Sequence, residues 1–422
     1  MKLSIVRDEI GPQASVIPHL DQVKQPASYT GPVVFKPSVK NVKAILQRDT
    51  RWAGRIWEDE FRDLTMLEPP ASASKAQKAW SWRERDTLDI LDFVQMNYGI
   101  DPRPNVVQTA INLVSTRPGV SRHPLREYLD ACVEAYDPDS PGVLDTWMFD
   151  FLGVADHMNG VECRALLSTV GRKWCIGAVA RARLEGCKMD NVLILKGTQG
   201  TGKSTALSVL GGAYFSDSNI DLKSKDAYQS IRGCWILEFA ELDSMKRSQA
   251  TAIKAFLSSS KDRFRPSYGS KVIEVPRHTV FCGTTNDQEF LIDTTGNRRF
   301  WPIETTGIDV KGLEQARDDI WAEACIALEN GETWHLPRDL ERQYEVIRQE
   351  YVQSHPWEGL VKDYLKNKLV PVSTNHILEH AIGKEKGRWN RADQMIVSGI
   401  LKDLGWTSKR MGGSRLWTNP VR

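Results

Sequence analysis

The sequence contains no long hydrophobic run and no closely spaced cysteine pair. Its longest apolar runs, such as VLIL and CWIL, fall far short of the roughly 20 residues that cross a bilayer. The N-terminus, MKLSIVRDEIGPQ, lacks the apolar core of a signal peptide. Seven cysteines are scattered without a CxxC pair, which argues against a zinc site and against a disulfide framework. We therefore expect a protein of a reducing cytoplasm with no membrane partner.

A large excess of charge of one sign is also missing. The chain has 56 Lys and Arg residues against 54 Asp and Glu residues, which gives a formal net charge of +2. Such a balance argues against a protein that coats nucleic acid over its whole surface, so any contact with DNA must be local. Of its 422 residues 41% are hydrophobic, which is enough for the cores of two or three domains. No internal repeat is evident.

The pattern along the chain predicts four regions. Residues 1–35 lack periodicity and are expected to form a loosely ordered arm, and residues 36–154 read as a helical accessory domain. In residues 155–335, strand-like runs such as VLIL, CWILEF and HTVFCGTTN alternate with helical stretches, which predicts an α/β core with a parallel sheet. Residues 336–422 are expected to form a helical linker and a small domain of two helices and a hairpin that resembles a winged helix.

The stretch GTQGTGKST between a predicted strand and a predicted helix matches a phosphate-binding loop (P-loop). Glycines allow the backbone N–H groups and the helix N-terminus to face phosphate groups that side chains would otherwise obstruct. Lys203 would neutralise the β and γ phosphates, and the Ser204 hydroxyl would bind Mg²⁺. The predicted binding residues for ATP are Gly197, Thr198, Gln199, Gly200, Thr201, Gly202, Lys203, Ser204 and Thr205. The alternative is a glycine-rich turn that fits the pattern by chance.

Hydrolysis requires a carboxylate near the metal and the attacking water, and the run CWILEFAELD offers Glu238, Glu241 and Asp243. Side chains alternate along a strand, so Glu238 and Glu241 cannot both face one side of a regular strand. Active sites of parallel sheets open at the carboxyl ends of the strands, which favours Glu241 as the water-polarising or metal-side carboxylate. Glu238 remains the second candidate, with a purely structural pairing as its alternative role.

Two further polar positions follow the third strand-like run. Asn286 ends TVFCGTTN and could hydrogen-bond the γ-phosphate or the attacking water, although Asn also commonly ends strands as a turn former. Arg298 and Arg299 lie in GNRRFW, between a turn and an apolar run. One of them could reach the γ-phosphate bound by a neighbouring subunit as an arginine finger, whereas the alternative is a pair of ordinary solvated charges.

The ordered set GTQGTGKST, WILEFAELD, KAFLSSSKDRFRPSYG, GTTN and GNRRFW resembles the virulence-associated protein E family of phages, satellites and genomic islands. The resemblance covers roughly residues 40–335. It implies a P-loop ATPase core similar to superfamily 3 helicases of the AAA+ class, working in a bacterial host cell. It also implies ATP and Mg²⁺ as cofactors and assembly into a ring, most simply a hexamer, with ATP held between subunits.

A hairpin is predicted where the extended runs RFRP and KVIEV flank SYGSK. In ring helicases that the family resembles, such a hairpin projects into the central pore. The resemblance therefore assigns Lys271, Tyr268 and Arg265 to binding single-stranded DNA, through phosphate neutralisation and base stacking. The alternative is a surface hairpin with solvated charges.

Together these expectations describe a DNA helicase or translocase that acts in the replication of a mobile element. No acidic cluster of a primase or polymerase is evident, so a separate primase would have to supply primers. Two other functions stay open: an oligomerising NTPase switch, and an ATP-regulated initiator that binds origin duplex through its C-terminal domain. In that domain Lys409, Arg410 and Arg415 in SKRMGGSR could contact a DNA backbone.

Overall fold

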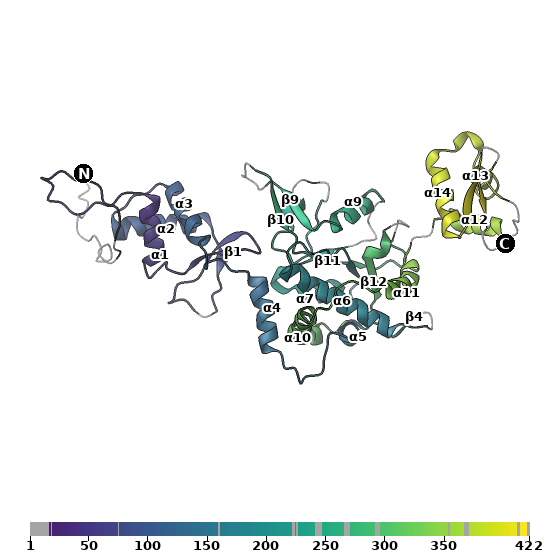
Figure 1. The fold of residues 1–422 in the computed structure, drawn as a ribbon, viewed down its shortest axis with the longest axis horizontal. Coiled ribbons are helices and arrows are strands. Elements are labelled where there is room, and N and C mark those ends of the chain that lie inside the picture. Colours follow the sequence, from purple (N-terminus) through teal and green to yellow (C-terminus); the bar gives the residue numbers. More distant parts are fainter. Residues whose placement is uncertain are drawn as a thin grey trace. The chain divides into compact units, whose positions relative to one another are not determined.

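A five-stranded parallel sheet organises the larger of two units of the chain (Figure 1). The computed structural model describes residues 17, 19–74, 76–158, 161–221, 224, 227–240, 247–265, 271–291, 296–352, 355–366, 371–411 and 414–419. Unit 1 comprises Met1–Asn286 and Arg298–Tyr344, and unit 2 comprises Asp287–Asn297 and Glu345–Arg422. Within the described residues no helix is long and apolar enough to cross a membrane.

The strands of this sheet are β6 (Val192–Lys196), β7 (Phe215–Ser216), β8 (Ile236–Phe239), β11 (Val280–Thr285) and β12 (Phe300–Glu304). Their order in the sheet is β12-β6-β11-β8-β7, and every neighbouring pair is parallel. Residues in β6 and β11 are almost all buried, because helices cover both faces of a parallel sheet. The expected α/β core with a parallel sheet is therefore confirmed.

Tryptophan side chains attach the covering helices to this sheet. The helices are α6 (Arg164–Arg183), α7 (Lys203–Gly211) and α10 (Val310–Glu329). The indole of Trp174 on α6 donates to the carbonyl of Phe281, and the indole of Trp321 on α10 donates to the carbonyl of Leu210 at 3.1 Å. Trp235, just before β8, lies 4.5 Å from Trp321 between ring centroids. Because each indole N–H has an acceptor, these large rings are buried without losing a hydrogen bond.

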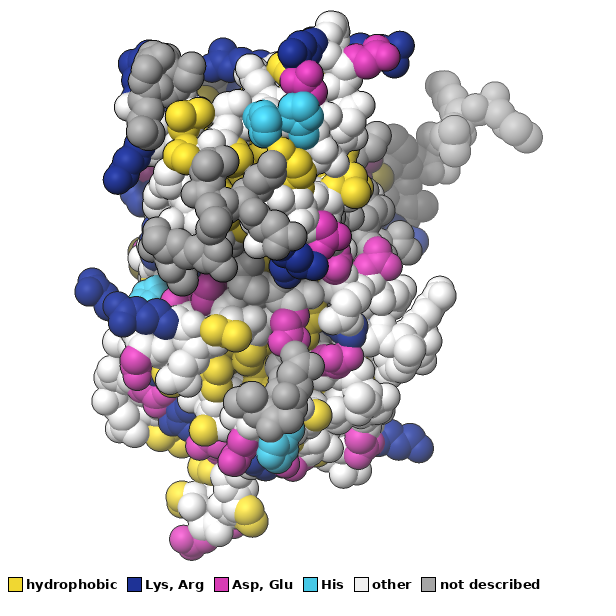
Figure 2. Space-filling model, turned by 90° about the vertical axis from the view of Figure 1, so that its right-hand side faces the viewer, with side chains coloured by type: hydrophobic (Ala, Val, Ile, Leu, Met, Phe, Trp, Pro, Cys, Tyr) yellow, Lys and Arg dark blue, Asp and Glu magenta, His cyan; other side chains and the backbone are white. Residues whose placement is uncertain are grey.

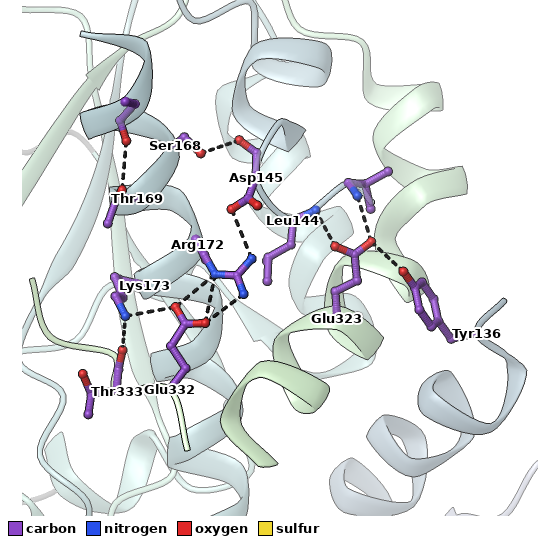
Figure 3. A network of polar contacts seen from close by, with 12 residues as sticks. Tyr136, Leu144, Asp145, Ser168, Thr169, Arg172, Lys173, Glu323, Glu332 and Thr333 are labelled. Atoms are coloured by element: carbon purple, nitrogen blue, oxygen red, sulfur yellow. Dashed lines mark hydrogen bonds and ion pairs between the residues drawn. The ribbon is translucent and has the colours of Figure 1, made fainter. Parts of the chain in front are cut away.

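A polar network joins α6, α10 and the segment before α5 (Trp147–Leu152) (Figure 3). Glu332 accepts hydrogen bonds from both Arg172 and Lys173, and these hydrogen bonds lower its pKa, with the Arg172 contact as the largest cause. Glu323 accepts from the backbone N–H groups of Val143 and Leu144 at 2.8 and 3.0 Å. The network ties the segment before α5 and the segment after α10 to the two helices α6 and α10.

The remaining helices and strands of unit 1 lie along the chain either before β6 or between β7 and β11. They are α1 (Val39–Arg48), β1 (Ile56–Asp59), β2 (Leu64–Leu67), β3 (Trp80–Ser81), α2 (Glu84–Tyr98), α3 (Pro104–Ser115), α4 (Pro124–Ala135), β4 (His157–Met158), β5 (Val161–Glu162), α8 (Ala227–Ser230), α9 (Arg247–Leu257), β9 (Lys261–Phe264) and β10 (Ile273–Pro276). Helix α11 (Arg338–Gln349) spans the boundary between the two units.

The region before α4 contains more than the helices expected from the sequence. Strands β1, β2 and β3 form an antiparallel sheet, and they escape the periodicity because each has four residues or fewer. Part of the expected loose arm is also packed, since Ile17 and Leu20 are buried in a core formed with α1, α2 and α3. An isolated antiparallel bridge joins Gln22 to Phe35.

Unit 2 contains α12 (Trp357–Leu365), α13 (Thr374–His380), α14 (Arg391–Asp403) and the hairpin of β13 (Thr407–Met411) and β14 (Ser414–Thr418). Val372 bridges antiparallel to Trp417, so a third extended segment joins the hairpin. A capping box between Asn390 and Asp393 starts α14. On the face of the molecule drawn in Figure 2, acidic and basic side chains are interspersed, in keeping with the small net charge.

Candidate functional site

The glycine-rich loop connects the carboxyl end of β6 to the start of α7. A Cβ atom on Gly197 would lie 2.5 Å from the carbonyl oxygen of Thr305, so only glycine fits where the loop passes the end of β12. Gly202 precedes α7 with a φ of +90°, a conformation that side chains disfavour. The first and last glycines of the motif are therefore explained by close approach and by backbone conformation, respectively.

Lys203 folds its side chain back over this loop. Its ammonium group donates to the carbonyl oxygens of Gly197 and Thr198, both at 2.8 Å, and to Oδ1 of Asn286 at 3.0 Å. Asn286 is the first residue after β11, the strand beside β6. A positive charge is thus held next to the backbone N–H groups at a helix N-terminus, an arrangement that suits an anion such as phosphate.

Ser204 and Glu238 meet on the other side of the same helix start. Oε1 of Glu238 accepts hydrogen bonds from the hydroxyls of Ser204 and Thr284, both at 2.7 Å. Glu238 is only 2% exposed, and its Oε2 has no hydrogen-bond partner among the described residues. A buried carboxylate oxygen beside a serine hydroxyl matches the oxygen ligands that Mg²⁺ prefers, so the residues fit that ion.

Of the two candidate glutamates, Glu238 and Glu241, the structure describes only Glu238. Strand β8 ends at Phe239, and Glu238 is the residue of this strand whose carboxylate reaches the loop helix. Glu241, which the sequence favours, lies outside the described residues. In the described part of the chain no group of three or more His, Cys, Asp or Glu side chains could hold a metal by itself. A metal at Ser204 and Glu238 would therefore need ligands from the nucleotide or water.

Thr284 is the member of this site that the sequence did not single out. It belongs to the same GTTN stretch as Asn286 and lies two residues earlier, so both side chains point to one face of the strand. Thr284 is 7% exposed and donates to Glu238. The alternation along the strand was therefore the signal that could have identified it.

Arg298 and Arg299 lie at the amino ends of the strands, whereas the glycine-rich loop lies at their carboxyl ends. They precede β12, whose first residue Phe300 pairs with Val192, the first residue of β6. Because the loop follows the last residue of β6, the length of a five-residue strand, about 16 Å, separates it from the arginines. Neither arginine belongs to the group around Lys203 and Glu238.

The two arginines also differ from each other. Nε of Arg299 donates to Asp190 and to the Ser258 hydroxyl, both at 3.1 Å, which makes it part of the local structure. Arg298 is exposed and lines a depression of about 330 Å³ together with Lys188 and Trp301, among other residues. Arg298 is therefore the arginine of the two whose side chain is exposed.

The predicted hairpin is formed by β9 and β10, which pair antiparallel. Lys271 and Arg265 are exposed beside its turn, whereas Tyr268 lies outside the described residues. At its base the buried Arg277 donates to Asp262 at 2.9 Å and stacks over Phe256 at 4.4 Å. These contacts attach the hairpin firmly to the core.

A second depression of about 200 Å³ lies beside the base of this hairpin and is lined by Phe61, His123 and His278, among other residues. The two imidazole rings are 5.5 Å apart, and Nε2 of His123 has no partner among the described residues. Burial lowers the pKa of His123 to about 4 and also lowers the pKa of His278. Both rings are therefore neutral near pH 7.

Comparisons with known proteins place the chain in a family. It is similar to the apo structure of the NrS-1 C-terminal region (305–718), at 12% identity and a TM-score of 0.45, over 88% of this chain and 98% of that chain. An A-form apo structure of the same region gives 12% identity and a TM-score of 0.44, over 86% of this chain and 95% of that chain. No curated protein matches the chain. A family model, the virulence-associated protein E-like domain, matches residues 134–353, just over half of the sequence, and the chain therefore belongs to this family.

Proposed function

We propose that this protein is an ATP-dependent DNA helicase or translocase that acts in the replication of a phage or other mobile element. Its core would be a P-loop ATPase of the AAA+ class similar to superfamily 3 helicases, followed by a winged-helix-like C-terminal domain. The observation that carries the proposal is the convergence of Lys203, Ser204, Glu238 and Asn286 on one glycine-rich loop. They come from the carboxyl ends of two parallel strands, β8 and β11, and from the helix after the loop, where nucleotides bind in such sheets.

In the proposed site the loop N–H groups and Lys203 bind the β and γ phosphates of ATP. Mg²⁺ would be held by Ser204 and would lie on the side of Glu238. It would supply the positive charge that neutralises the phosphate oxygens. Asn286 orients the attacking water or the γ-phosphate, and a glutamate, Glu241 or Glu238, accepts the proton of that water. The water oxygen bonds to the γ phosphorus while the bond to the bridging oxygen breaks, which releases ADP and phosphate.

Neither Arg298 nor Arg299 belongs to the site of its own chain, and the position of Arg298 suggests how an arginine could reach the transferred phosphoryl group. Arg298 lies a strand's length from its own loop, is exposed, and so can reach only a nucleotide held by a second copy of the chain. A ring, most simply a hexamer, gives every loop a neighbour's arginine. Arg299, already bonded to Asp190, would position the segment that carries Arg298.

The β9–β10 hairpin is the proposed contact with single-stranded DNA. Lys271 would bind a phosphate, assisted by Arg265 and Tyr268, and the buried Arg277 at the hairpin base would transmit movement of the core to it. Since Arg277 packs on Phe256, at the end of α9, the hairpin and that helix are expected to shift together.

The test compares Lys271→Ala with Lys78→Ala, another exposed lysine far along the chain. We expect Lys271→Ala to keep its basal ATPase but to lose most DNA stimulation and strand displacement on forked DNA, because a phosphate contact in the pore is removed. Lys78→Ala should behave as wild type. A purified protein without ATPase activity would contradict the proposal, and ATPase activity that single-stranded DNA never changes would instead indicate an NTPase switch.

A further inference from the structure

The end of the chain, residues 371–419, contains a surface whose charge is not balanced. Its described residues include eight Lys and Arg side chains and four Asp and Glu side chains. Three of the basic residues form ion pairs with three of the acids: Lys384 with Asp393, Lys386 with Glu379, and Arg388 with Glu385. The five that form no ion pair with a described residue are Arg391, Lys402, Lys409, Arg410 and Arg415. Their excess charge lies on two neighbouring elements, α14 and the β13–β14 hairpin.

Helix α14 presents one side to solvent over its full length. Arg391, Met395 and Lys402 are exposed, and their spacing of four and seven residues places them on one face of the helix. Val397, Ile400 and Leu401 are buried in the core of unit 2, which fixes the opposite face. The exposed face is therefore about 20 Å long, has a cation near each end, and is held by a core of its own.

The hairpin carries a like-charge pair. Arg410 and Arg415 lie directly opposite each other in the β13–β14 register, and both are exposed. Like charges in directly opposed positions destabilise a hairpin, and no acidic side chain of the described residues pairs with either of them. Arg415 is oriented by a 3.0 Å hydrogen bond to Ser408 and by its position 5.6 Å from the ring of Trp417. An anion bound between the two guanidinium groups would relieve the repulsion.

We propose that α14 and the β13–β14 hairpin form a binding surface for duplex DNA that works without ATP. The helix has the diameter that the major groove of B-DNA admits, and Arg391 lies in its first turn, while the hairpin arginines bind phosphates of the adjoining backbone. The described Phe, Tyr and Trp side chains of unit 2 are all buried or half-buried, so none of them offers a stacking platform for single strands. The deep, narrow major groove of RNA duplexes excludes a helix.

The test uses the full-length protein without nucleotide and a 20-base-pair DNA duplex closed by loops at both ends, which cannot thread through a ring. Two double variants, Arg391→Ala with Lys402→Ala and Arg410→Ala with Arg415→Ala, each remove two positive charges. The matched control, Lys386→Ala with Arg388→Ala, removes two charges that are already paired with acids. Fluorescence anisotropy gives the affinity at several salt concentrations.

We expect each of the two double variants to lose about tenfold or more in duplex affinity at ~0.1 M salt and to lower the salt slope by about two, because two phosphate contacts are removed. The control should stay within about threefold, and ATPase stimulation by single strands should not change in any variant. The hairpin variant should also be at least as resistant to urea as wild type, since its like-charge pair is gone. Duplex affinity unchanged in both double variants, or a loss of affinity for RNA or single strands in these variants as large as their loss for the closed duplex, would overturn the proposal.

Discussion

Replacing Glu238 with Gln separates the function of this side chain from its effect on folding. The two side chains have almost the same shape, so the amide oxygen of Glu238→Gln can still accept from the hydroxyls of Ser204 and Thr284. The amide nitrogen then occupies the place of Oε2, the buried oxygen without a partner among the described residues. The substitution therefore removes a negative charge and the free oxygen while it leaves the packing intact.

The structure gives opposite signs for the two consequences. Loss of a side chain that supports a bound metal lowers metal affinity or activity about 10- to 100-fold. We therefore expect kcat for ATP hydrolysis to fall by up to about 100-fold, equivalent to roughly 2.7 kcal/mol. Folding without ligand should not suffer, because a buried charge without a full set of partners costs more than a neutral amide in the same place. We expect the free energy of unfolding of Glu238→Gln to lie between that of wild type and a value about 1 kcal/mol higher.

Phosphate release under saturating ATP measures the first effect, and urea denaturation with and without magnesium and ATP measures the second. Thr284→Val is the control: it removes one hydrogen-bond donor but keeps the charge, so it should lower both activity and stability modestly. A Glu238→Gln protein that hydrolyses ATP at near wild-type rate refutes the metal-side role. One that is about 2 kcal/mol less stable than wild type shows that the carboxylate serves the fold instead.

Two other predictions concern different parts of unit 1. Lys203→Ala and Arg298→Ala should each be inactive. An equal mixture reassembled from subunits should regain activity at about a quarter of its sites, since an intact loop and an intact arginine from different copies can then meet. A mixture as inactive as its components rules out completion of the site by a neighbour. His123, with its pKa lowered to about 4 by burial, contributes stability that is complete above pH 6.5 and is lost as pH falls from 6.5 toward 4, at up to about 1.4 kcal/mol per pH unit. Urea denaturation from pH 7.5 to 5 should show this slope in wild type and in the exposed control His335→Gln, and a smaller slope in His123→Gln; equal slopes in all three would refute it.

The parts of the fold that local sequence determines were predicted correctly. The run VLIL became the buried strand β6 because four successive apolar residues suit a strand covered on both faces. The glycine spacing placed Lys203 at the start of the following helix, since the motif fixes both residues within a few positions. The hairpin around SYGSK was confirmed in its two strands for the same reason.

The parts that depend on distant neighbours were not predictable. Whether Glu238 reaches the loop depends on β8 lying beside β11, which supplies Thr284, and that pairing joins residues 46 positions apart. Arg298 and Arg299 are adjacent and chemically identical, so only the positions of Asp190 and Ser258 distinguish them. The short strands β1, β2 and β3 carry too few residues to produce a period.

The distance between the loop and Arg298 has a consequence for how the protein would behave in a cell. On the proposed function, a lone polypeptide carries two incomplete halves of a reaction centre, one at each end of the strands of its sheet. ATP hydrolysis would then rise more steeply than the amount of protein synthesised, and below a threshold amount little ATP would be hydrolysed. Expression level alone could thus time the onset of replication, without a dedicated inhibitor.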